Sequence, residues 1–129
     1  MSAAIYQAFA AIVDAYAVAN SIPVKYPGYH FDPPDQGRWL EVKWFPNEGI
    51  QYGLGDNGLS QDRGFGQVSC CMRPGASLVT SLEFSDAIIA LFPKGTKLAG
   101  ASVEKKPWAS TTLESDNQVT VPITIRYFT

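Results

Sequence analysis

The sequence contains few of the residues that usually carry covalent or metal chemistry. Of its 129 residues, two are cysteines, the neighbours Cys70 and Cys71, and one is a histidine, His30. Adjacent cysteines cannot form an ordinary structural disulfide with each other, so we expect free thiols and assembly in a reducing cytoplasm.

Membrane signals are missing as well. No Lys or Arg occurs among residues 1–24, so the N-terminal stretch lacks the basic start of a secretory signal and the basic face of a membrane-surface helix. No apolar run approaches the roughly 20 residues that cross a bilayer. We therefore expect no membrane association.

Charge is sparse and slightly acidic. Charged residues make up 17% of the chain, and 10 Lys+Arg against 12 Asp+Glu give a net charge of -2. A dedicated nucleic-acid binder would show a basic excess, so that class is disfavoured. Apolar residues reach 46%, which excludes a disordered chain and favours one domain over residues 1–129 whose surface is partly covered by neighbours.

Hydrophobic periodicity predicts two helices. The first spans residues 3–19, and the second spans residues 76–92. The residues expected to face the core in the first helix are Ile5, Phe9, Ile12, Val13 and Tyr16. Those expected in the second helix are Leu78, Leu82, Ser85, Ile89 and Phe92, with Ile88 at the flank.

Alternating apolar and polar residues predict strands between and after the helices. The predicted strands are residues 38–45, 65–72 and 119–128, with further extended pieces at 24–26 and 103–108. Pro122 indicates an edge strand or a bulge, because proline has no N–H to donate to a neighbouring strand. The order of elements predicts an α+β sandwich, in which two helices pack on one face of a mostly antiparallel sheet.

Two polar excursions interrupt this pattern, a glycine-rich loop at about 46–63 and an arm at about 109–118. Six of the 11 glycines lie between Gly49 and Gly66. Long loops inside compact domains are uncommon and usually functional, and contact with a partner can offset the entropy of ordering them. The excursions favour assembly over catalysis.

Motifs for cofactor and metal chemistry are weak. Residues 53–58 match G-x-G-x-x-G, but no helical pattern follows and no acidic residue lies about 20 positions further on, so a dinucleotide site is disfavoured. The oxygen-bearing residues Asp56, Asn57 and Asp62 lack calcium-loop spacing and are more typical of turns. We expect no cofactor and no metal.

A nucleophilic site would have to join His30 to Cys70 or Cys71, with Asp32 or Asp35 orienting the imidazole ring. The cysteines lie in the middle of a predicted strand, and nothing local marks either as reactive. A buried, small apolar role explains at least one of them better. We therefore expect no catalytic residues, although a small ligand-binding or Cys/His enzyme domain remains an alternative.

The chain resembles the tail terminator (tail completion) proteins of long-tailed bacteriophages over most of its length. The resemblance depends on the order of elements and on several segments, of which Leu-Phe-Pro-Lys-Gly-Thr is the most specific. These segments are Ile22–Val24, Phe31–Pro34, the strand Trp39–Phe45, Leu91–Thr96 and Val121–Ile125.

The resemblance implies a structural virion protein with no catalytic residues. Tail terminators form hexameric rings on the head-proximal end of the tail tube, stop polymerisation of the major tail tube protein and present a surface to the head–tail connector. DNA would pass through the ring without specific binding. The alternative within this class is another virion joint, such as a head-closure or tail tube protein.

The candidate contact residues come from the loop and from a basic pair near Trp108. In the loop, aromatic, aliphatic and Arg side chains are typical of interface anchors, and Lys105 and Lys106 could meet an anionic partner, with a solvated edge as the simpler alternative. The full set of interface candidates is Tyr52, Leu54, Leu59, Arg63, Lys105 and Lys106.

Overall fold

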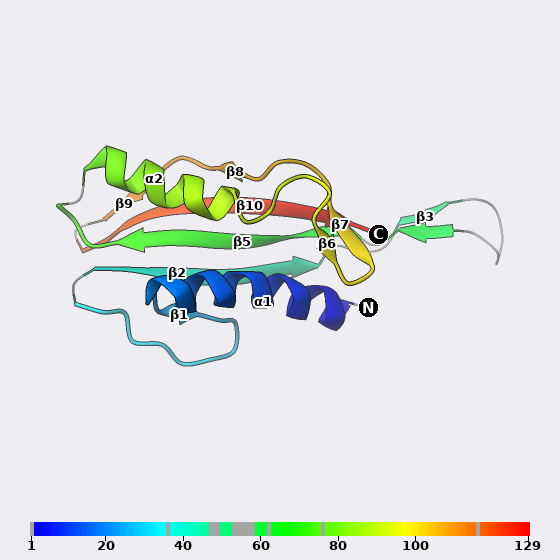
Figure 1. Ribbon diagram of the computed structural model, residues 1–129, viewed down its shortest axis with the longest axis horizontal. Helices are drawn as coiled ribbons and strands as arrows, with labels where there is room; N and C mark the ends of the chain where they lie inside the picture. Colours follow the sequence, from blue (N-terminus) through cyan, green and yellow to red (C-terminus); the bar gives the residue numbers. More distant parts are fainter. Residues whose placement is uncertain are drawn as a thin grey trace.

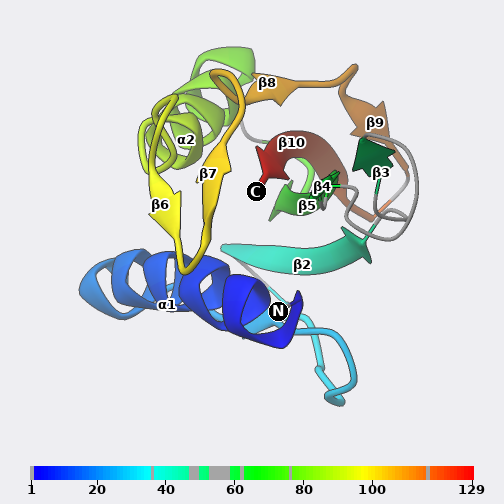
Figure 2. The same ribbon diagram turned by 90° about the vertical axis from the view of Figure 1, so that its right-hand side faces the viewer.

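The computed structural model describes residues 2–35, 37–46, 50–52, 59–61, 63–75, 77–115 and 117–129. Two helices and a curled, mostly antiparallel sheet form the body of the molecule (Figures 1 and 2). The helices are α1 (Ser2–Asn20) and α2 (Leu78–Ile89). The strands of the main sheet are β1 (Val24–Lys25), β2 (Arg38–Pro46), β5 (Arg63–Met72), β6 (Lys97–Leu98), β7 (Ala101–Val103), β8 (Trp108–Ala109), β9 (Leu113–Glu114) and β10 (Val119–Phe128).

The three strands predicted with the clearest alternation form the centre of this sheet. The strand order is β1-β2-β5-β10-β7-β6, and β8 and β9 also pair with β10. β2 and β10 pair with β5 in antiparallel registers that place Val42 and Ile123 beside Val68. The two-residue β1 pairs with β2 in parallel. The expected α+β class and mostly antiparallel sheet are confirmed.

Pro122 does not mark an edge strand, because β10 pairs on both sides. On one side Pro122 lies opposite Ser69 of β5. On the other side β9 pairs with Val119 and Thr120, and β8 pairs with Ile123 and Thr124. Pro122 thus lies at the break between β8 and β9, where its carbonyl accepts a hydrogen bond from the Ser110 N–H at 2.8 Å. Such a break tolerates the missing proline N–H.

The first helix follows its predicted pattern. Ile5, Phe9, Val13 and Ala17 are buried at i, i+4, i+8 and i+12, which is one stripe of a helix. The C-terminus of α1 ends in a Schellman arrangement, in which the Ile22 N–H donates to the Ala17 carbonyl at 2.9 Å and the next residue after the helix adopts a positive φ.

The second helix is rotated relative to the prediction. Its buried residues are Ser81, Phe84, Ser85 and Ile88, whereas Leu78 is 65% exposed and Leu82 is 48% exposed. The predicted stripe was therefore right for Ser85 and Phe92 but wrong for Leu78 and Leu82, because Ser81, Phe84 and Ile88 face the core instead. The helix also ends at Ile89 and does not reach residue 92 as predicted.

Two serines make the rotated orientation of α2 possible. The Ser85 hydroxyl donates to the Ser81 carbonyl at 2.9 Å, and the Ser81 hydroxyl lies 3.7 Å from Met72 Sδ on β5. Because these hydroxyls have partners, their burial carries little cost. Small side chains on this side let α2 approach the sheet closely, with Phe84 and Ile88 filling the space.

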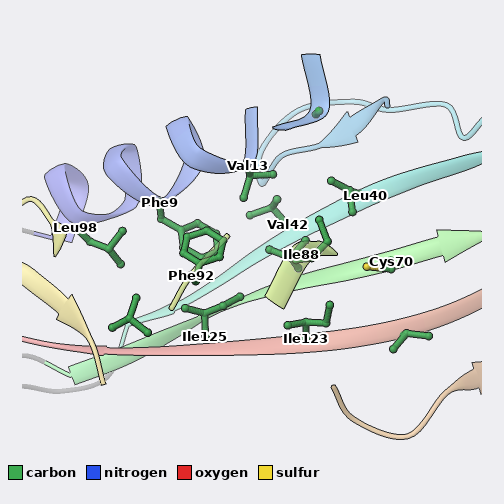
Figure 3. Close-up of a cluster of buried hydrophobic side chains, with 14 of the residues drawn as sticks. Phe9, Val13, Leu40, Val42, Cys70, Ile88, Phe92, Leu98, Ile123 and Ile125 are labelled. Atoms are coloured by element: carbon green, nitrogen blue, oxygen red, sulfur yellow. The ribbon is translucent and has the colours of Figure 1, made fainter. Parts of the chain in front are cut away.

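Both helices pack on the same face of the sheet. Figure 3 shows Phe9 and Val13 of α1 directed toward the side chains of the strands, with Ile88 and Phe92 in the same cluster. The rings of Phe9 and Phe92 stack with centroids 4.9 Å apart. Gly66 of β5 lets Phe9 lie against the strand, because a Cβ at Gly66 would come within 2.7 Å of the Phe9 ring.

The segment expected to be a loop contains a small second sheet. β3 (Ile50–Tyr52) and β4 (Leu59–Gln61) pair in antiparallel register, and Figure 1 shows this β3–β4 hairpin beyond the end of the main sheet. The expected strand at 103–108 is instead divided between β7 and β8. The expected arm at 109–118 includes β9, whose two residues pair with β10.

Candidate interaction surfaces

The β3–β4 hairpin carries two of the six predicted interface residues. Tyr52 and Leu59 are register partners at one end of the described hairpin. Leu54 lies outside the described residues. Because the two strands form a sheet of their own, they extend β2 and β5 away from the core and place this segment where another molecule could reach it.

Arg63 begins β5 at the base of the hairpin. It lies opposite Phe128 in the β5–β10 pair and is half-buried. The structure therefore places Arg63 at the same end of the sheet as the hairpin.

Lys105 and Lys106 form a separate basic site. Both are exposed, and they lie in the connection between β7 and β8. Lys105 Nζ lies 4.6 Å from the centroid of the Trp108 ring, a cation–π contact. Since β7 and β8 pair with the side of β10 opposite β5, the lysines and Arg63 do not form one patch.

The sheet face opposite the helices, here called the polar face, bears a concave surface. A groove of about 410 Å³ lies between β2 and β5 on one side and the segment from β9 to β10 on the other. Its lining includes Glu41, Lys43, Gln67, Ser69 and Glu114. The mixed charges and amides fit a polar contact surface better than an apolar ligand pocket.

A second groove follows the outer edge of β2. It has a volume of about 320 Å³, and it lies between Val42–Phe45 of β2 and Tyr26–Gly28, where the chain leaves β1. Lys25 Nζ lies 3.8 Å from Glu41 Oε1 at one end of this groove. The sequence alone did not indicate this groove. It exists because β1 has only two residues and leaves most of the nine-residue β2 without a partner on this side, and the sequence does not show where such pairing stops.

The exposed side of α1 carries a shallow, tyrosine-lined groove of about 400 Å³. Here the Tyr26 hydroxyl donates to Asp14 Oδ1 at 3.2 Å. Burial, together with the Asp14 carboxylate, raises the pKa of Tyr26 to about 12. The sequence analysis did not predict this groove, because it used the absence of Lys and Arg from residues 1–24 only against a secretory signal and a membrane-surface helix.

The thiols and the histidine do not form a reactive site. His30 Nε2 lies 3.1 Å from Asp32 Oδ1, and both side chains are more than four-fifths exposed. Cys70 and Cys71 are buried near the C-terminal end of β5, on opposite faces of the sheet. Burial raises the pKa of both thiols, that of Cys71 to about 12 with a further contribution from Glu41, so neither is an activated nucleophile.

The described residues also bear on metal binding and on membrane spanning. No group of three or more His, Cys, Asp or Glu side chains there could hold a metal ion. No described helix is both long enough and apolar enough to span a bilayer. The glycine motif at 53–58 lies outside the described residues.

Comparisons with known proteins place the chain in a family. A family model described as "Phage tail terminator protein" matches residues 4–127. No protein with curated annotation matches in sequence.

Solved structures share the fold. One protein superposes with a TM-score of 0.80 at 25% identity, over 99% of this chain and 94% of its own. A chain of the virion of a native gene transfer agent particle has a TM-score of 0.54 at 14% identity, over 99% and 92%. Because the family model spans nearly the whole sequence, the chain belongs to the phage tail terminator family, which consists of structural virion proteins and not of enzymes.

Proposed function

We propose that this protein caps the head-proximal end of the phage tail tube, ends polymerisation of the tube protein and presents the surface that joins the head–tail connector. The observation that carries the proposal is the family match over residues 4–127. The likeness of the fold to a chain of a gene transfer agent virion is compatible with it. The functional site is then a set of docking surfaces.

A hexameric ring is the assembly through which the cap acts. A closed ring uses two different surfaces of each subunit, so that one surface of a copy meets the other surface of the next. The β3–β4 hairpin and the edge of β2 supply one set of candidate surfaces, and the Lys105–Lys106 site supplies another. The contacts divide among neighbouring copies, the major tail tube protein and the connector.

DNA passes through the bore of this ring without specific binding. A passage that held phosphate groups tightly would slow ejection, and strong phosphate binding requires clustered basic residues. The net charge of -2 is compatible with a neutral or acidic lining.

The decisive experiment is electron microscopy of tails assembled with and without the protein. We expect tails of uniform length joined to heads when it is present, and tubes of variable length without heads when it is absent. Uniform, head-joined tails in its absence would refute the proposal. The tail tube alternative is tested with the purified protein, since a tube protein polymerises alone into long filaments and a terminator does not.

The part played by the hairpin is tested by deleting Gly49–Gly58, which removes β3. We expect the remaining chain to fold, because the buried cluster is built from α1, α2, the strands of the main sheet and the segments that join them. The deleted protein should no longer cap tubes. The control is Glu83→Ala, an exposed position on α2 that lies outside the candidate surfaces and leaves the hairpin intact. Normal capping by the deletion variant would show that capping does not need the hairpin.

A further inference from the structure

The edge of β2 beyond β1 and the outer edges of the β3–β4 hairpin have no partner strand among the described residues. We propose that they pair between neighbouring copies, so that the β3–β4 hairpin of one copy adds to the free edge of β2 in the next. The inference rests on the proposed ring and names the surfaces that close it.

The free edge of β2 is defined by its register. The Leu40 N–H donates to the Pro23 carbonyl at 2.9 Å, so the main chain of Leu40 is directed away from β5. Because main-chain direction alternates along a strand, Val42 and Trp44 direct their N–H and C=O groups to the same side. Pairing with β1 ends at Glu41. Beyond that point no strand in the described part of the chain occupies this edge.

Space for an additional strand lies along this edge. The groove of about 320 Å³ is bounded by Val42–Phe45 on the β2 side. On the other side the chain turns away at Pro27, which has no N–H to donate, and at Gly28, which has a φ of 86°. β1 is therefore unable to continue the pairing. An exposed strand edge is the surface that extended segments bind by main-chain hydrogen bonds.

The β3–β4 hairpin offers the complementary element. Each of its strands has three residues, and they pair only with each other among the residues described. An isolated two-stranded ribbon is at best marginally stable in water, whereas a third strand satisfies one of its outer edges. In Figure 1 the hairpin extends beyond the main sheet and does not return to the β2 edge of its own chain. The occupant of that edge is consequently a second copy.

Charge supports the same pairing. Residues 47–62 contain three acidic residues, Glu48, Asp56 and Asp62, and no Lys or Arg. The groove beside β2 is lined by Lys25 and Lys43 against the single carboxylate of Glu41. Since Lys25 lies beside Glu41, the exposed Lys43 is the cation left to attract an acidic segment. Complementary charge steers the encounter and disfavours the alternative in which two β2 edges meet.

Cross-linking on assembled tails tests the pairing. Tails are assembled with an equal mixture of two variants that each add one cysteine to the native pair, Lys43→Cys and either Ser60→Cys or Gln51→Cys, and treated with a short bismaleimide. The native thiols do not interfere, because they are buried and their pKa values are raised. We expect dimers that require both variants, at a yield several-fold above the control mixture of Lys43→Cys with Ala19→Cys.

The outcomes separate this inference from the proposed function, since tail length is measured on the same sample by microscopy. If tails are uniform and capped but the yield of cross-linked dimers does not exceed that of the control, the inference is overturned and the proposed capping function is not affected. Cross-links from Ser60→Cys or Gln51→Cys to the tube protein in place of Lys43→Cys would also overturn it, because the hairpin would then bind the tube.

A charge reversal gives a second readout. Lys43→Glu should lower incorporation into tails several-fold relative to Lys43→Gln, and added salt should reduce the difference. Equal incorporation of the two variants at low salt would contradict the charge complementarity on which the choice of occupant depends.

Discussion

The two faces of the sheet differ although the same strands build both. Along β2, Leu40, Val42 and Trp44 face the helices, whereas Glu41 and Lys43 lie on the polar face between them. The helix face is filled by rings and aliphatic side chains in contact, and the polar face keeps an open concave surface. The helix face therefore carries most of the buried cluster, and the polar face, where Trp39 and Cys71 are also buried, keeps a surface open to other molecules.

The largest expected difference in the free energy of unfolding is between alanine variants of two phenylalanines. Phe9 is fully buried between Trp44 and Phe92, so Phe9→Ala should lower the free energy of unfolding by about 3–5 kcal/mol. Phe45, on the polar face, is 39% exposed and stacks on Phe65 with centroids 4.7 Å apart. Phe45→Ala should cost about 1 kcal/mol. Urea unfolding followed by circular dichroism compares them, and equal losses would break the distinction between the faces.

Gly66 provides a finer test of packing on the helix face. A methyl group at Gly66 would come within 2.7 Å of the Phe9 ring and 3.0 Å of the Trp44 ring. We expect Gly66→Ala to lower the free energy of unfolding by about 1–3 kcal/mol through overpacking. In the double variant, Phe9→Leu should recover part of that loss, because the smaller side chain makes room. Strict additivity in this double-mutant cycle would show that the two positions do not compete for space.

The sequence predicted the helix face well wherever the hydrophobic period was unambiguous. The strand predicted at 119–128 coincides with β10, and the stripe of α1 was found because large side chains recur at Ile5, Phe9 and Val13. Part of the inner side of α2 was missed, because the predicted stripe included Ser85 but chose Leu78 and Leu82 over Ser81 and Phe84. Ser81 and Ser85 are polar side chains of a kind that usually indicates solvent. Their hydroxyls find partners only in the folded helix and in β5.

The candidate surfaces were less predictable. The glycine-rich composition of residues 46–63 predicted a functional loop. It did not predict β3 and β4, because strands of three residues are too short to show an alternating pattern. The free edge of β2 begins where its pairing with β1 ends, and this depends on the tertiary structure. Lys105 and Lys106 were recognised as a basic pair, and their separation from Arg63 by β10 required the strand order.

The two faces of the sheet can also be compared through the ionisation of Cys70 and Cys71, which are neighbours on opposite faces of β5. Burial and Glu41 raise the pKa of Cys71 from 9.0 to about 12. In the unfolded chain this thiol ionises near its ordinary value, so its contribution to stability is fully present below pH 9.0 and is lost as pH rises toward about 12. We expect the free energy of unfolding to fall in that window.

Replacing the thiol isolates this effect from other groups that ionise at alkaline pH. Cys71→Ser should show a smaller fall in the free energy of unfolding above pH 9.0 than the unaltered protein. Parallel urea titrations below and above that pH provide the measurement. Identical pH dependence in the two proteins would mean that Cys71 is ionised as easily in the folded chain as in the unfolded one.

The smallest effect is expected at Leu82, and it tests the orientation of α2 directly. Leu82 is 48% exposed on the outer side of the helix, whereas Ile88 is fully buried against the sheet. Leu82→Lys should change the free energy of unfolding by no more than about 0.5 kcal/mol, as is usual for surface positions. Ile88→Ala, the matched control, should cost about 2–5 kcal/mol. If Leu82→Lys destabilised the protein as much as Ile88→Ala, the stripe containing Leu78 and Leu82 would face the core, and the buried serines would have to lie outside.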